Sequence, residues 1–215
     1  MVVGAGNLVL SPPRWIGAAA VSVRAGGRTC GVAAGTPLAA LADLRLAGGP
    51  PLAIRDYGHC SSSPRASGQL FVYSVDGETN HGQNGWEYKV NNRSGTTGAA
   101  DPSGAQGDGR LLAPRAQVLW FWCQAFGGGC QRNLALSAAS AVSRGGTLRV
   151  RVTGYDNYGR GAAMAGARVT LAGSAATTGG SGVVTLRAPS RPGAFTLAAS
   201  RPGSVPAFHQ TVTVR

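Results

Sequence analysis

The segment from Gly85 to Asn92, G-W-E-Y-K-V-N-N, constrains the fold more than any other stretch of this chain. Its aromatic and aliphatic side chains alternate with charged ones, which is the two-residue period of a half-buried β-strand. Asn91 and Asn92 end the segment, and asparagine tolerates the left-handed backbone angles of a tight hairpin turn. The hydrophobic run Val118–Cys123, V-L-W-F-W-C, predicts a central strand.

One helix is predicted in a chain that otherwise favours strands and turns, since 34 of its 215 residues are glycine and 12 are proline. Thr36 is a preferred N-cap residue, and Pro37 suits the first helical position. The leucines that follow supply an apolar face, and Gly48-Gly49 ends the helix. Other strands of this half are predicted over 19–25, 52–54 and 69–75.

The second half of the chain has a different character, because short strands there alternate with glycine-rich turns. Thr147–Gly154 alternates strictly, and further strands follow at short intervals up to residue 214. This spacing is typical of a β-sandwich. We therefore expect an N-terminal tail over residues 1–18, a first domain over 19–137 and a β-sandwich over 138–215.

The four cysteines, Cys30, Cys60, Cys123 and Cys130, are even in number and contain no close C-x-x-C pair. Two disulfides in an exported protein are the simplest interpretation. Cys123 and Cys130 flank a loop with three consecutive glycines, which is flexible enough to close a disulfide, and this leaves Cys30 for Cys60. A zinc site is the alternative, but the usual ligand spacing is missing.

These cysteines predict an extracellular or cell-surface location. The first ten residues do not add to that prediction, because they lack the basic region and the apolar length of a signal peptide. No segment approaches the ~18 uninterrupted apolar residues of a membrane helix, so no membrane span is expected.

The net charge of +12 raises the question of a nucleic-acid partner. Its carriers are almost all arginines, scattered singly, without the basic runs that mark polyanion sites. We therefore expect dispersed, solvated charge and no nucleic acid. Residues 1–137 carry a net charge of +4 and residues 138–215 one of +8, so an acidic partner such as a cell-wall polymer would be drawn to the second half.

The motif Gly85–Asn92, placed between Phe71–Val75 and Val118–Trp122, resembles the DUF4430 family, the transcobalamin-like C-terminal domain. The helix pattern of that family is matched by Thr36–Leu41. The resemblance covers about residues 19–137 and implies an α+β, β-grasp-like domain with one helix. It also implies a corrinoid ligand, but the α-helical barrel that completes the corrinoid site in transcobalamins is missing from this sequence, so no cofactor is expected.

The segments Val150–Gly159, Ala165–Leu171 and Thr177–Val183 follow one another in the order of a second family pattern. They are similar to bacterial Ig-like domains of the Big-1 or invasin type. Gly179 stands where that pattern has an aspartate, which argues against a calcium role. The resemblance implies an Ig-like β-sandwich that serves as a stalk or spacer, and with it a mainly β protein.

No combination of residues in the sequence amounts to an active site, and no enzyme activity is expected. His59 and Cys60 are adjacent, so a strand would point them to opposite faces, and a disulfide explains the cysteine better. Asp76, Glu78 and His81 share one loop, where solvated polar side chains are a better explanation than a metal site.

The aromatic residues are the best candidates for binding, although a core is the preferred explanation of Trp86, Tyr88, Trp120 and Trp122. If one of them is exposed, it becomes a ligand platform. The tentative ligand-binding residues are Trp86, Tyr88, Asn91, Asn92 and Tyr73. The loops 78–84 and 94–110 would form the walls of that site.

The predicted function is a non-enzymatic, secreted or cell-surface binding module on an Ig-like spacer. Its partner would be a cell-wall polymer, a surface protein or a small ligand. The alternative is a structural or adhesive cell-envelope protein without a small-molecule ligand.

Overall fold

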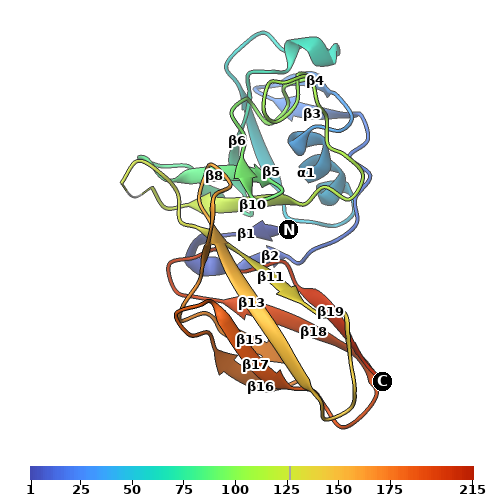
Figure 1. The fold of residues 1–215 in the computed structure, drawn as a ribbon. Helices are drawn as coiled ribbons and strands as arrows, with labels where there is room; N and C mark the ends of the chain where they lie inside the picture. Colours follow the sequence, from blue (N-terminus) through green and yellow to red (C-terminus); the bar gives the residue numbers. More distant parts are fainter. Residues whose placement is uncertain (126) are drawn as a thin grey trace. The chain divides into compact units, whose positions relative to one another are not determined.

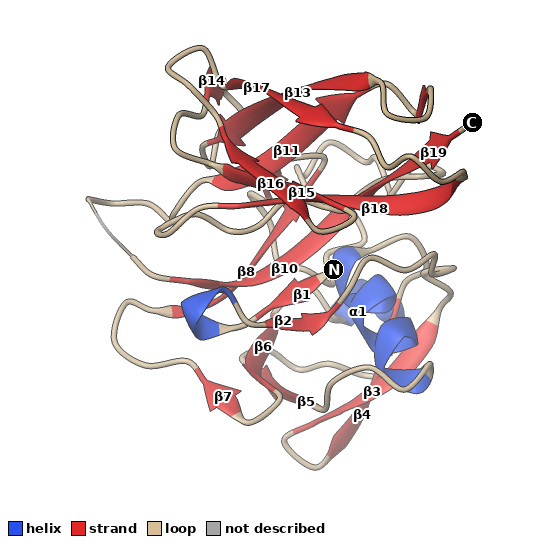
Figure 2. Ribbon diagram, turned by 90° about the horizontal axis from the view of Figure 1, so that it is seen from below, coloured by secondary structure: helices blue, strands red, loops and turns tan. Residues whose placement is uncertain are grey.

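The fold is mainly β, as the sequence predicted. A computed structural model describes residues 1–125 and 127–215, and Figure 1 shows its strands in sequence colours. Four sheets hold 44% of the residues as strand, and the described residues contain one α-helix, drawn in blue in Figure 2 together with the short 3-10 turns. The chain divides into two compact units, Met1–Gly129 and Cys130–Arg215.

The boundary between the units lies earlier than the predicted residue 138. Asn133–Ala138 forms a strand, β11, that pairs antiparallel with β13 (Thr147–Tyr155) over six residues. Because β11 supplies backbone hydrogen bonds and the buried Leu134 to the sandwich, it belongs to the second unit and not to a linker.

The first unit contains two five-stranded sheets. Sheet 1 has the order β2-β1-β10-β8-β9, and sheet 2 has the order β4-β3-β5-β6-β7. The strands of sheet 1 are β1 (Val2–Val3), β2 (Val9–Ser11), β8 (Gly85–Val90), β9 (Arg93–Ser94) and β10 (Val118–Cys123). The strands of sheet 2 are β3 (Val21–Ala25), β4 (Arg28–Val32), β5 (Leu52–Asp56), β6 (Leu70–Val75) and β7 (Glu78–Thr79).

The first eleven residues contain two strands of sheet 1, β1 and β2, so the expected N-terminal tail is wrong for this part of the chain. β1 is buried and lies parallel to β10, with Val2 opposite Trp120. β2 pairs antiparallel with β1. Packing Val2 and Val3 against β10, the most hydrophobic strand of the chain, removes their apolar surface from water. A solvated tail would leave that surface exposed.

The helix α1 (Pro37–Leu46) is confirmed with its predicted start. The Thr36 hydroxyl oxygen accepts a hydrogen bond from the Ala39 backbone N–H at 3.2 Å. α1 contacts β3 of sheet 2 and β10 of sheet 1, and it buries Leu38 and Leu41. The core of the first unit therefore lies between two sheets and one helix.

Replacing Thr36 by alanine is expected to lower the free energy of unfolding of the first unit by about 1 kcal/mol, the usual cost of a lost N-cap hydrogen bond. Urea unfolding followed by tryptophan fluorescence measures this unit alone, because all four tryptophans lie before residue 130. The exposed Thr96 is the matched control, and Thr96→Ala should change stability by less than about 0.5 kcal/mol. A loss no larger in Thr36→Ala than in Thr96→Ala would contradict the capping role.

The second unit is a sandwich of two sheets around one core. In sheet 3, β13 pairs with β11, β14 (Gly161–Ala163) and β17 (Val183–Arg187). Sheet 4 has the order β12-β19-β18-β15-β16. Its strands are β12 (Ala141–Val142), β15 (Arg168–Leu171), β16 (Ser174–Thr177), β18 (Gly193–Ser200) and β19 (Gln210–Val214).

Buried and exposed residues alternate along β13, so one face of sheet 3 is apolar and packs in the core while the other faces outward. Leu148, Val150 and Val152 are buried against Val169 and Leu197 of sheet 4. The residues between them on β13 point outward, because successive strand residues face opposite sides of a sheet. The predicted β-sandwich is therefore confirmed.

Candidate functional site

The four predicted aromatic residues of sheet 1 meet as two cross-strand pairs. Trp86 of β8 lies opposite Trp122 of β10, with ring centroids 5.8 Å apart and an edge-to-face angle of 76°. Tyr88 lies opposite Trp120, with ring centroids 5.4 Å apart. Such pairs stabilise the fold by roughly 0.5–1.5 kcal/mol, in addition to the stabilisation that comes from burying the ring surfaces.

Trp86 and Tyr88 are core residues, at 4% and 6% exposure, which corrects their assignment as ligand-binding residues. The indole Nε1–H of Trp86 donates to the Glu78 carbonyl at 2.8 Å, and the Tyr88 hydroxyl donates to the Thr97 carbonyl at 2.9 Å. Burial raises the pKa of the Tyr88 hydroxyl. The loops that were expected to wall a site therefore close over the rings instead.

Glycine makes this closure possible next to Tyr88. The chain at Gly95 approaches the Tyr88 ring so closely that a Cβ atom there would overlap the hydroxyl. A side chain at residue 95 would therefore push the loop off the ring.

Asn91 and Asn92 form the predicted hairpin turn between β8 and β9. Their φ angles are 48° and 71°, and positive φ at both central residues is the geometry of the tightest hairpin turns. The side-chain oxygen of Asn91 accepts a hydrogen bond from the Gln117 backbone N–H at 2.9 Å. This side chain therefore connects the turn to the residue that precedes β10.

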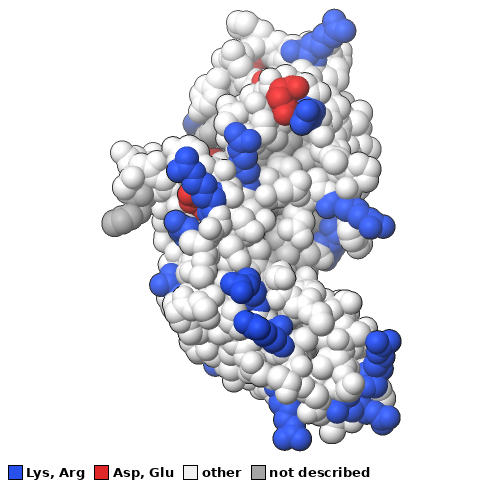
Figure 3. Space-filling model, in the orientation of Figure 1, with Lys and Arg blue, Asp and Glu red and all other residues white. Residues whose placement is uncertain are grey.

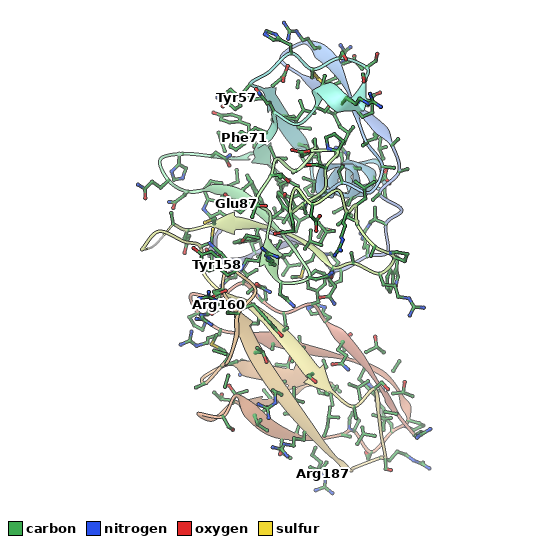
Figure 4. All side chains as sticks on the ribbon, turned by 45° about the horizontal axis from the view of Figure 1, so that its top comes forward. Tyr57, Phe71, Glu87, Tyr158, Arg160 and Arg187 are labelled. Atoms are coloured by element: carbon green, nitrogen blue, oxygen red, sulfur yellow. A yellow bond between two sulfur atoms is a disulfide. The ribbon has the colours of Figure 1, made fainter. Side chains whose placement is uncertain are left out.

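Tyr73, the remaining predicted residue, lies on the outward-pointing side of β5 and β6, which we call the outer face of sheet 2. The guanidinium carbon of Arg55 lies 3.4 Å from the centroid of the Tyr73 ring. Phe71 pairs with Arg55 across the strands and is 39% exposed. Tyr57 is 64% exposed, and its ring centroid lies 5.8 Å from that of Phe71. Figure 4 shows the Tyr57 and Phe71 side chains next to each other, directed away from the sheet.

The backbone around Tyr57 is held in place by Asp56. Its carboxylate oxygens accept hydrogen bonds from the backbone N–H groups of Gly58 and Cys60, both at 3.0 Å. Arg28 of β4 lies 3.6 Å from the same carboxylate. The backbone donors and the nearby Arg28 charge hold the pKa of Asp56 below its usual range, so the carboxylate stays ionised and keeps these bonds at neutral pH.

A disulfide joins Cys30 of β4 to Cys60, as predicted. Cys123 and Cys130 are also disulfide-bonded, and no cysteine is free. Because Cys30 is bonded to Cys60, the second disulfide joins Cys123 to Cys130. The Cys30–Cys60 bond and the Asp56 carboxylate together fix both ends of the turn that carries Tyr57, so the outer face of sheet 2 is preorganised.

The three polar residues considered for a metal site do not gather. Glu78 accepts a hydrogen bond from the Ala5 backbone N–H at 2.9 Å, and the His81 ring lies 5.4 Å from that of Trp122. Asp76 occupies the turn after β6 with a φ of 53°. Within residues 1–125 and 127–215, no group of three metal-ligating side chains occurs, and no helix is long and apolar enough to cross a membrane.

Tyr57 was not predicted as a site residue because the strand was expected to end at Ile54. β5 continues to Asp56, which places Tyr57 two residues beyond Arg55 and on the same side of the sheet. The alternation in β6 did contain a signal, since it separates Phe71 and Tyr73 from the core residues Leu70 and Val72.

No protein-family profile matches this sequence, and no curated protein is significantly similar to it. The resemblances to the DUF4430 family and to bacterial Ig-like domains therefore stay predictions. The case for a function rests on the geometry of the outer face of sheet 2.

Proposed function

We propose that this protein is a non-enzymatic binding module of the cell surface or the extracellular space, which binds its ligand on the outer face of sheet 2. The observation that carries the proposal is the exposed pair of Tyr57 and Phe71 beside the Arg55–Tyr73 stack. Rings on a rigid sheet offer apolar contact area at a small cost in conformational entropy. Grouped exposed apolar side chains are typical of binding surfaces.

A saccharide chain of the cell envelope is the ligand that this surface fits best. The C–H face of a sugar ring packs on an aromatic ring, while its hydroxyl groups accept hydrogen bonds. Arg55 can supply them, because a guanidinium has five N–H donors at its edge and stacks on Tyr73 with its face. The combination of rings and donors suits an amphipathic ligand better than a purely apolar one.

The location and the domain roles have separate support. Two disulfides indicate an oxidising environment such as the extracellular space. The β-sandwich of the second unit suits a spacer, as its resemblance to bacterial Ig-like domains implies. A corrinoid is not proposed, because the motif residues Trp86 and Tyr88 have no exposed ring for it.

Replacing Tyr57 and Phe71 together by alanine is expected to weaken binding to purified cell-wall polysaccharide at least tenfold, since both exposed rings are lost. A tenfold change corresponds to about 1.4 kcal/mol of binding free energy. Co-sedimentation with the insoluble polysaccharide measures the affinity. Tyr158→Ala is the matched control, because Tyr158 of the second unit is 75% exposed, and this variant should bind as the parent does.

Equal binding of the double variant and the parent, at equal melting temperatures, would reject the outer face of sheet 2 as the site. If the parent itself binds no cell-wall polysaccharide and no other saccharide chain, the alternative function remains. The protein would then be a structural or adhesive component of the cell envelope.

A further inference from the structure

The second unit is strongly and unevenly basic. Residues 130–215 contain ten arginines, no lysine and one acidic residue, Asp156. Figure 3 shows arginine atoms in blue over β13 and around the rest of this unit. A surface of this kind repels itself unless counter-ions or an acidic partner neutralise it.

Three of these arginines occupy the outward-pointing side of β13 and β17, which we call the arginine face of sheet 3. Arg149 and Arg151 alternate with buried valines on β13, so their Cα atoms lie about 7 Å apart. Arg187 of β17 pairs with Thr147, which makes it a diagonal neighbour of Arg149 at ~7–8 Å. In Figure 4, Arg187 is labelled near the start of β13.

The contacts of these side chains orient them without neutralising their charge. Arg187 donates from Nε to the Gly145 carbonyl at 3.3 Å, and Arg151 donates to the Ser181 carbonyl at 3.5 Å. A carbonyl has no net charge, and each guanidinium keeps further N–H donors. Asp156 is five residues beyond Arg151 on the chain, about 17 Å along an extended strand. This separation exceeds the Debye length of ~8 Å at physiological ionic strength.

The arrangement is particular to sheet 3. The strands of sheet 4 contain one arginine, Arg168, and their other outward residues are mainly threonine and alanine. Like charges on neighbouring strand positions are destabilising, so the cluster on sheet 3 has an energetic cost that the fold does not require. A partner with repeated negative charges would remove that cost.

We infer that the arginine face of sheet 3 binds a linear polymer with repeated phosphate groups, as a second site in addition to the proposed one on sheet 2. Arginine is suited to phosphate because its planar donors match two oxygens at once. Single-stranded nucleic acid fits less well, since proteins bind it by stacking bases on aromatic rings. The residues paired with the arginines across the strands are Thr147, Thr185, Val183 and Ser137, none of which is aromatic. The aromatic residue on the same side of β13, Tyr155, lies four residues beyond Arg151.

The test uses the full chain, fluorescently labelled linear inorganic polyphosphate and anisotropy at several NaCl concentrations. The variant Arg149→Gln/Arg151→Gln/Arg187→Gln should bind at least tenfold more weakly than the parent. Its slope of log K against log[salt] should fall by about 2, since each lost phosphate contact on a single chain contributes about 0.7. The control Arg168→Gln/Arg191→Gln/Arg201→Gln removes the same charge and should stay within threefold of the parent.

Three outcomes would overturn the inference. The first is no binding of polyphosphate by the parent. The second is an equal loss in both triple variants with unchanged melting temperatures, because the attraction would then depend only on net charge. The third is tighter binding of oligothymidylate than of polyphosphate at equal phosphate number, which would assign the face to a nucleic acid.

Discussion

Trp86→Ala is expected to lower the free energy of unfolding of the first unit by about 3–5 kcal/mol, the range for deleting a large aromatic side chain from a core. Trp86 is 4% exposed and packs edge-to-face against Trp122. Its loss also removes the donor to the Glu78 carbonyl. Urea unfolding followed by the fluorescence of Trp120 and Trp122, which remain in the variant, measures the change.

Trp15 provides the control for this prediction. It belongs to the same unit and is 83% exposed, so Trp15→Ala should change stability by less than about 0.5 kcal/mol. If Trp86→Ala instead unfolds like the parent and loses affinity for a ligand, the indole is part of a binding surface and not of the core. The pair of variants therefore separates the two explanations that the sequence left open.

Periodicity predicted the strands and the helix that are long enough to show a repeating pattern of apolar and polar residues. The alternation of β13 and the N-cap of α1 are local patterns that the structure confirms. β8 is a strand as predicted, but its Lys89, expected among the charged residues of a half-buried strand, is buried. β1 was missed because two valines contain no period at all. Its position depends on the parallel pairing with β10, whose residues come more than 100 positions later in the chain.

The candidate site was harder to predict than the fold, because alternation separates two faces of a strand without showing which one is covered. Trp86 and Phe71 both occur in alternating strands, and both are large aromatics. Trp86 is buried because it packs against Trp122 of β10, a strand that comes much later in the chain. Phe71, on the outward-pointing side of β6, stays 39% exposed. The pairing of β8 with β10 is a long-range contact, and a short window of sequence does not contain it.

Replacing Cys30 and Cys60 together by alanine is expected to destabilise the first unit by about 3.6 kcal/mol, because the bond closes a 30-residue loop and restricts the unfolded chain. The same relation gives about 2.4 kcal/mol for the much shorter loop between Cys123 and Cys130. Alanine suits the comparison, since Cys30 and Cys60 are buried and a new hydroxyl would add a desolvation cost. Urea unfolding of both double variants, followed by tryptophan fluorescence, gives the two values.

The order of the two losses is the decisive part of this prediction. If removing Cys123–Cys130 costs as much as removing Cys30–Cys60, loop entropy does not explain the stabilisation. The Cys30–Cys60 variant should also bind cell-wall polysaccharide less tightly under conditions where it is fully folded. Its turn would then depend on the Asp56 hydrogen bonds alone to position Tyr57 beside Phe71. Unchanged affinity in that variant would mean that the carboxylate is sufficient to hold the outer face of sheet 2 in its binding geometry.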